Sequence, residues 1–187
     1  MARVKKNVLT QGLSGKLGKQ LVFRQVGERT IVASLPGPWV KPFTEPQQVH
    51  HQQFKEAIKY AKSVIADPEK KAGYKAAAIN GMSAFNFAVS DYMNLPVILE
   101  LDLSGYTGEI GSSIRIKAID NFKVVSVSVS IFKADDTLVE TGQAIRSSNG
   151  LDWFYTSAYQ NTEMKGGKIV ATVTDTPGHC VEMMKML

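Results

Sequence analysis

The sequence predicts an α+β protein in two parts. Residues 1–95 are expected to form an N-terminal β-hairpin plus two or three helices, and residues 96–187 an all-β immunoglobulin-like sandwich of about seven strands. Apolar residues recur at every second position in 114–118 and 125–131, which indicates strands with one buried face. Apolar residues in 54–65 instead recur at helical spacing. The period changes from about 3.6 to 2 at Leu95-Pro96, which we interpret as the domain boundary.

The N-terminal segment divides into an arm and a hairpin. Residues 1–19 are rich in glycine, serine and lysine, so we expect a loop or arm there. Residues 19–35 are typical of a hairpin, because Gly27-Glu28 suits a type II′ turn between two apolar runs. That turn places Phe23 opposite Val32 and Arg24 opposite Ile31. Pro36, Gly37, Pro38 and Pro42 then end regular structure.

Capping residues mark the starts of the three predicted helices. Thr44 caps the first, with Pro46 in its first turn. Asp67-Pro68 ends this helix and starts the second, which we expect to stop or kink at Asn80-Gly81. Ser83 starts the third helical piece, whose apolar residues precede Leu95.

Seven short segments with turn residues between them follow. Seven strands in about 90 residues is the number expected of an immunoglobulin-like domain. In the fifth, Trp153 and Tyr155 alternate with Phe154, so one of these sets is expected in the core. The predicted strands are residues 97–103, 113–119, 124–132, 137–144, 153–158, 168–175 and 180–184.

The charge distribution, the single cysteine and the lack of long apolar runs bear on the partners and location that we expect for the protein. Residues 1–42 hold eight Lys or Arg against Glu28 alone, so the net charge of +5 originates in the N-terminal segment. The single cysteine, Cys180, excludes an intrachain disulfide and is expected to be buried. No secretory signal or membrane-spanning run is visible, so we expect a cytoplasmic protein without membrane insertion.

Residues able to carry chemistry are sparse. His50 and His51 are helix neighbours that point about 100° apart, so they do not share a ligand face. His179 and Cys180 are neighbours in a strand region and point to opposite faces, which argues against a catalytic dyad. Aspartates at predicted strand ends leave calcium binding open as an alternative, although aspartate is common in turns. We expect no catalytic residues, no metal and no cofactor.

Five segments carry a resemblance to a known family. The order LSGKLG, LVFRQVGERTIVASLP, DPEKKAGY, FNFAVSDYMNLPVI and LDLSGYTGEIGSSIRIKAIDNFKVVSVSVSIF resembles an uncharacterised bacterial family common in Bacteroidetes. The second half also resembles bacterial Ig-like domains with a D-x-PGN turn before the last strand, and here His179 replaces the Asn. The resemblance implies a fold but no activity, and it carries over no catalytic residues.

The predicted function is a non-enzymatic binding or assembly module with a protein partner or self-association. The alternative is nucleic-acid binding through the basic N-terminal segment, and a hydrolase with an unrecognised site stays open as a third hypothesis. Self-association is assigned to one set of residues and partner contact to another. The first set is Phe23, Arg24, Arg29, Ile31 and Trp39, and the second is the loop residues Asn121, Phe122 and Asn149.

Overall fold

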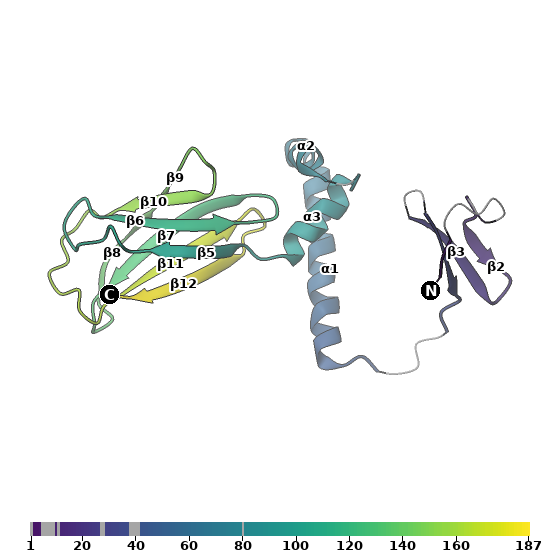
Figure 1. The fold of residues 1–187 in the computed structure, drawn as a ribbon, viewed down its shortest axis with the longest axis horizontal. Coiled ribbons are helices and arrows are strands. Elements are labelled where there is room, and N and C mark those ends of the chain that lie inside the picture. The colour runs from purple at the N-terminus through teal and green to yellow at the C-terminus, as the bar shows by residue number, and fades with distance from the viewer. Residues whose placement is uncertain (1, 5–9, 11, 27–28, 38–41, 80) are drawn as a thin grey trace. The chain divides into compact units, whose positions relative to one another are not determined.

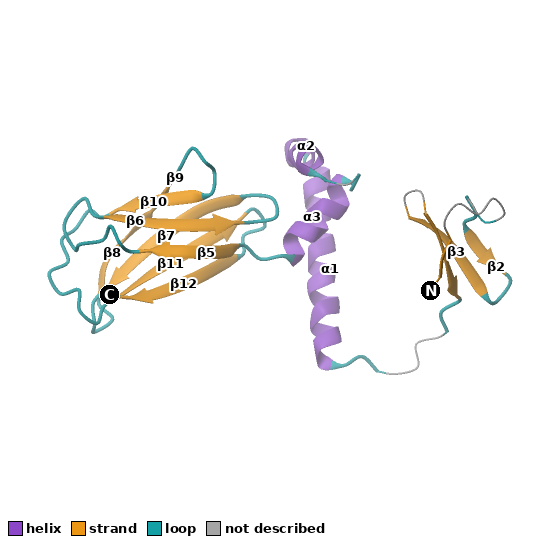
Figure 2. Cartoon of the chain, viewed as in Figure 1, coloured by secondary structure: helices purple, strands orange, loops and turns teal. Residues whose placement is uncertain are grey.

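The structure is a computed structural model that describes residues 2–4, 10, 12–26, 29–37, 42–79 and 81–187. Its contacts divide the chain into two compact units, Met1–Thr44 and Glu45–Leu187, hereafter unit 1 and unit 2. The fold is mixed and mostly β: three helices lie in the chain between an N-terminal sheet and two further antiparallel sheets (Figure 2). The helices thus share a compact unit with the strands that follow. The change of period at Leu95-Pro96 is a helix-to-strand transition inside unit 2.

Unit 1 is a four-stranded antiparallel sheet, which we name sheet A. Its strands are β1 (Ala2–Val4), β2 (Gly15–Leu17), β3 (Leu21–Val26) and β4 (Arg29–Ser34), in the order β1-β4-β3-β2. The predicted hairpin register is confirmed, with Phe23 opposite Val32 and Arg24 opposite Ile31. The expected arm over 1–19 is wrong where β1 and β2 form, because the free edges of the hairpin offer backbone partners even to three-residue segments. The predicted Gly27-Glu28 turn lies outside the described residues.

The three helices are α1 (Glu45–Ala66), α2 (Pro68–Ala77) and α3 (Ala84–Met93). Asp67 caps α2 by accepting hydrogen bonds from the amides of Glu69 and Lys70, and Ser83 caps α3 through the amide of Asn86. The helices form their own core cluster, which consists of Ala61, Val64, Tyr74, Ala84, Phe87 and Ala88. No helix in the described part of the chain is long and apolar enough to cross a membrane.

The remaining strands form two four-stranded antiparallel sheets. Sheet B has the order β5-β6-β10-β9 and sheet C the order β12-β11-β7-β8 (Figure 1). The strands are β5 (Val97–Asp102), β6 (Ser113–Ile119), β7 (Val124–Phe132), β8 (Leu138–Gln143), β9 (Ile145–Arg146), β10 (Asp152–Thr156), β11 (Lys168–Asp175) and β12 (Cys180–Met186). All seven predicted strands are present, and β9 is an addition that the sequence did not predict.

Sheets B and C share one apolar core, because their inward residues follow the predicted alternation. Ile114 and Ile116 of β6 meet Val127 and Val129 of β7 in a single buried cluster. Trp153 and Tyr155 are the buried set of β10, whereas Phe154 is 41% exposed. The β6–β7 and β11–β12 connections lie at the end of these sheets that faces the helices (Figure 1). The candidate functional site lies at this end of the two sheets.

Candidate functional site

Sheet A separates its side chains into an apolar and a basic face. Directly opposed residues share a face, and neighbours along a strand alternate. The register therefore groups the apolar residues Leu17, Leu21, Phe23 and Val32 on one side, which we call the apolar face and which also carries Gln25, Thr30 and Ser34. The opposite side, which we call the basic face, carries these residues: Lys16, Val22, Arg24, Val26, Arg29, Ile31 and Ala33.

The residues predicted for self-association divide between these faces. Phe23 lies on the apolar face, and Arg24, Arg29 and Ile31 lie on the basic face. Phe23 and Ile31 are partly buried, whereas both arginines are exposed. Trp39 lies outside the described residues. The structure therefore brings four of the five predicted residues into one sheet but places them on opposite sides of it.

The loop residues predicted for partner contact have different positions. Asn121 is exposed in the β6–β7 loop. Asn149 holds its own turn, because its Oδ1 accepts the amides of Leu151 and Asp152. Phe122 turns inward and stacks on Tyr74 of α2 with ring centroids 4.2 Å apart, so it joins the helices to sheets B and C.

A buried polar network lies at this junction, and sequence reasoning missed it. Asp91 of α3 is 0% exposed. Its Oδ2 accepts a hydrogen bond of 2.6 Å from the Tyr74 hydroxyl, which lies 2.8 Å from the hydroxyl of Tyr60 on α1. Its Oδ1 has no hydrogen-bond partner among the described residues. The sequence does contain a signal for this network. Asp91 lies one helical turn after Phe87 and Ala88, on the same apolar stripe of the predicted third helix.

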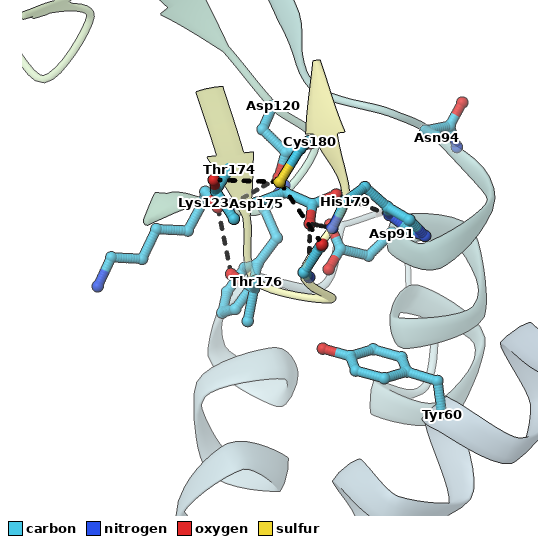
Figure 3. Close-up of polar contacts among 12 residues, drawn as sticks. Tyr60, Asp91, Asn94, Asp120, Lys123, Thr174, Asp175, Thr176, His179 and Cys180 are labelled. Carbon is cyan, nitrogen blue, oxygen red and sulfur yellow. Dashed lines mark hydrogen bonds and ion pairs between the residues drawn. The ribbon is translucent and has the colours of Figure 1, made fainter. Parts of the chain in front are cut away.

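The β11–β12 turn contributes a second polar pair to the junction. His179 Nδ1 lies 2.9 Å from Oδ2 of Asp175, whose Oδ1 accepts the amides of Gly178 and His179. The His179 ring also meets Tyr92 of α3 edge-on, with centroids 4.7 Å apart. Figure 3 shows Asp91, Asp120, Asp175 and His179 gathered where the turn approaches the helix. The turn residue that departs from the Ig-like pattern therefore contacts the helical part of unit 2.

The electrostatics of the junction disfavour the ionised form of Asp91 relative to an aspartate in water. Burial raises the pKa of Asp91 to about 6, and the hydrogen bond from Tyr74 opposes the rise. The carboxylates of Asp120 and Asp175 raise it further, whereas His179 lowers it. Burial also raises the pKa of Tyr74, so this hydroxyl stays a donor at all physiological pH values.

Replacing Tyr74 by Phe is expected to raise the pKa of Asp91 further. The substitution removes the donor that favours the ionised form and leaves the ring in place. Carboxyl titration by carbon-detected NMR measures the shift, and the wild-type chain supplies the reference. An unchanged Asp91 titration in a folded Tyr74→Phe protein would show that the bond does not act on the carboxyl.

A pocket of ≈ 330 Å³ adjoins this turn. Six residues line it: Gln53, Glu56, Tyr92, Met93, Leu95 and His179. The Asp175–His179 pair resembles the base and orienting acid of hydrolases. The other oxygen of Asp175, Oδ1, accepts hydrogen bonds from the amides of Gly178 and His179, so the same carboxylate also holds the turn in place. Within the described ranges, no group of three or more His, Cys, Asp or Glu side chains could hold a metal ion.

Cys180, predicted to be buried, is exposed. The prediction is wrong because Cys180 lies opposite Thr174, on the outward face of sheet C, whereas the next residue, Val181, packs against the core. Its Sγ lies 3.5 Å from the hydroxyl of Thr174.

The comparisons with known proteins add little to this geometry. No family model matches the sequence, and no curated protein matches it. A crystal structure of an engineered protein is similar to part of the chain, with 14% identity and a TM-score of 0.35. That match covers 58% of this chain and 28% of the engineered chain. A likeness of this size supports no argument about function.

Proposed function

We propose that the protein is a non-enzymatic assembly module in which the apolar face of sheet A is covered by a second copy. One observation carries the proposal: the residues of unit 1 that the structure describes form a single layer of four strands. Among its described side chains only Thr30 is buried, at 4% exposure. A sheet with one apolar face normally packs that face against a second layer.

A second copy suits this face for reasons of shape and charge. Two identical sheets can pack face to face about 10 Å apart around a twofold axis, so that each apolar face covers its own equivalent. The basic faces then point outward on both sides, and Lys16, Arg24 and Arg29 of the two copies stay apart. An unlike partner would need a complementary surface that nothing in the chain specifies.

The expected association is reversible. The four apolar side chains are partly exposed, and burying the remainder of each is worth on the order of 1 kcal/mol. Eight such side chains across a dimer therefore gain roughly 8 kcal/mol, which is comparable to the cost of about 4–15 kcal/mol for lost translational and rotational freedom. The dimer fraction should rise with concentration.

Replacing Leu17 by Glu is expected to abolish this association. Leu17 is 61% exposed, so the substitution adds a charge to the apolar face without opening a core. Sedimentation velocity over a concentration series measures the dimer fraction, and circular dichroism checks the fold. The matched control is Ile145→Glu, because Ile145 of β9 is 78% exposed and belongs to unit 2. A wild-type chain that stays monomeric at the highest concentration, or an Ile145→Glu effect equal to that of Leu17→Glu, contradicts the proposal.

Three finer assignments, of fold, family and location, stay proposals. The strand orders β5-β6-β10 and β12-β11-β7-β8 support an immunoglobulin-like arrangement, since they correspond to A-B-E and G-F-C with one additional strand. Membership of the Bacteroidetes-type family rests on the sequence resemblance alone. A cytoplasmic location stays a prediction from the sequence.

A further inference from the structure

The basic face of sheet A collects positive charge without compensation. Glu28 is the only acidic residue in the first 44 positions. Lys16, Arg24 and Arg29 are exposed, and no acidic side chain pairs with them in the described part of unit 1. Surface cations of folded proteins usually have opposite charges among their neighbours. Within the described residues, this face therefore presents three cationic groups to an anion without an acidic partner.

The register sets the spacing of these groups. Lys16 lies opposite Val22, two residues before Arg24 on β3. Arg24 lies opposite Ile31, two residues after Arg29 on β4. Both pairs are diagonal neighbours, which lie about 7–8 Å apart in an antiparallel sheet. The three cations thus form an oblique row across β2, β3 and β4.

This row matches the charge repeat of a nucleic-acid strand. One strand of a duplex carries a phosphate about every 3.4 Å of axis. Because the backbone winds around that axis, neighbouring phosphates lie farther apart than this, at a spacing comparable to the about 7–8 Å between the cationic residues. Two of the three groups are guanidinium ions, whose paired donors fit two oxygens of one phosphate. The aromatic Phe23 lies on the opposite face, so base stacking contributes nothing here.

We infer that the basic face of sheet A binds the phosphate backbone of nucleic acid, independently of base sequence. The inference goes beyond assembly and does not require the dimer, because the apolar and basic faces are separate. In a dimer the two basic faces would be outward and available to separate strands. An anionic membrane is less favoured, since surface-bound elements usually insert large apolar or aromatic side chains and the apolar side chains of the basic face are the aliphatic residues Val22, Val26, Ile31 and Ala33.

Fluorescence anisotropy of the full-length chain with labelled DNA tests the inference. With three phosphate contacts, log K should fall with log salt at a slope of about −3 for duplex and about −2 for single strands. Affinity should therefore drop about 20- to 40-fold between about 50 and 200 mM salt. Oligonucleotides of different sequence should bind within about threefold of one another, because phosphate contacts carry no sequence information.

The decisive variant replaces both exposed arginines by glutamine, Arg24→Gln with Arg29→Gln. Two lost contacts should reduce the duplex slope to about −1 and weaken binding at least tenfold at low salt. The matched control is Lys59→Gln with Lys62→Gln on α1, which removes the same charge from exposed positions of unit 2. Its slope should stay near −3.

Three results would overturn the inference. The first is no binding of either DNA form at low salt. The second is equal loss in the arginine and lysine double variants, which would show a net-charge effect. The third is binding to phosphatidylserine-containing vesicles but not to DNA, which would assign the face to a lipid surface. Sedimentation velocity on the same variants distinguishes a failure of this inference from a failure of the proposed dimer. The arginine double variant should still dimerise, whereas Leu17→Glu should not.

Discussion

Replacing Asp91 by Asn is expected to stabilise the protein at neutral pH by up to about 3 kcal/mol. The folded state raises the pKa of Asp91 from 3.8 to about 6. A shift of this size corresponds to about 3 kcal/mol. Asn keeps a carbonyl oxygen for the Tyr74 hydroxyl and places an amide where Oδ1 now lacks a partner. The variant therefore removes the cost of a buried carboxylate while preserving the hydrogen bond.

The raised pKa of Asp91 also makes the free energy of unfolding depend on pH. A carboxyl whose pKa is raised on folding binds its proton more tightly in the folded state, so its contribution is fully present below pH 3.8. That contribution is lost as pH rises towards about 6 and stays absent above it. The wild-type free energy of unfolding should fall across this interval relative to the Asp91→Asn protein.

Urea unfolding at several pH values measures both effects. The matched control is Asp136→Asn, because the Asp136 side chain is 73% exposed and its removal should leave the Asp91 contribution unchanged. The two curves, wild type and Asp91→Asn, should converge near pH 4, diverge as the pH rises to about 6 and stay apart by a constant amount above it. The expectation would be contradicted by an Asp91→Asn protein that is less stable than wild type at pH 7 and whose stability changes with pH as that of wild type does. Such a result would show that the buried Asp91 carboxylate does not destabilise the folded state.

The second large effect is expected at Phe122. Truncation to Ala removes the ring that stacks on Tyr74 and meets Phe87 edge-on at 6.0 Å. Buried Phe→Ala substitutions cost about 3–5 kcal/mol, and the lower end applies because Phe122 is partly exposed. The lost ring also weakens the attachment of the helices to sheets B and C.

Denaturant unfolding followed by circular dichroism measures this loss. Phe154→Ala is the matched control, because Phe154 is 41% exposed and lies outside the core of sheets B and C. The control should cost less than about 1.5 kcal/mol. If Phe122→Ala costs no more than Phe154→Ala, the stacked ring is not a structural link. A helical signal lost before the β signal in Phe122→Ala would further support the link.

Local patterns account for the elements that the sequence predicted well. The alternation in β6, β7 and β11 fixes which residues face the core, and all three strands have the predicted bounds. The capping side chains of Asp67 and Ser83 accept hydrogen bonds from amides at most three residues further along the chain, so the local sequence is enough to predict them. The hairpin register followed from one two-residue turn.

The missed features depend on groups that are distant in the sequence. Strands β1 and β2 have three residues each and form only because the hairpin offers free edges. The environment of Asp91 is set by Tyr74 on another helix, by Asp120 in the β6–β7 loop and by Asp175 at the end of β11. Sequence periodicity assigns each of these residues to a face of its own helix or strand, but it does not indicate which distant residues lie beside it. The predicted role of Phe122 in partner contact stays untested, and the structure assigns this ring an intramolecular contact.

The exposed thiol at the start of β12 has a practical consequence for handling the protein. As the single cysteine of the chain, Cys180 can oxidise against its equivalent in another molecule and crosslink two copies. Such a covalent product would sediment like a dimer even in Leu17→Glu. Sizing measurements therefore require a reductant or a Cys180→Ser background, and the same unique thiol offers one attachment point for a fluorophore beside His179.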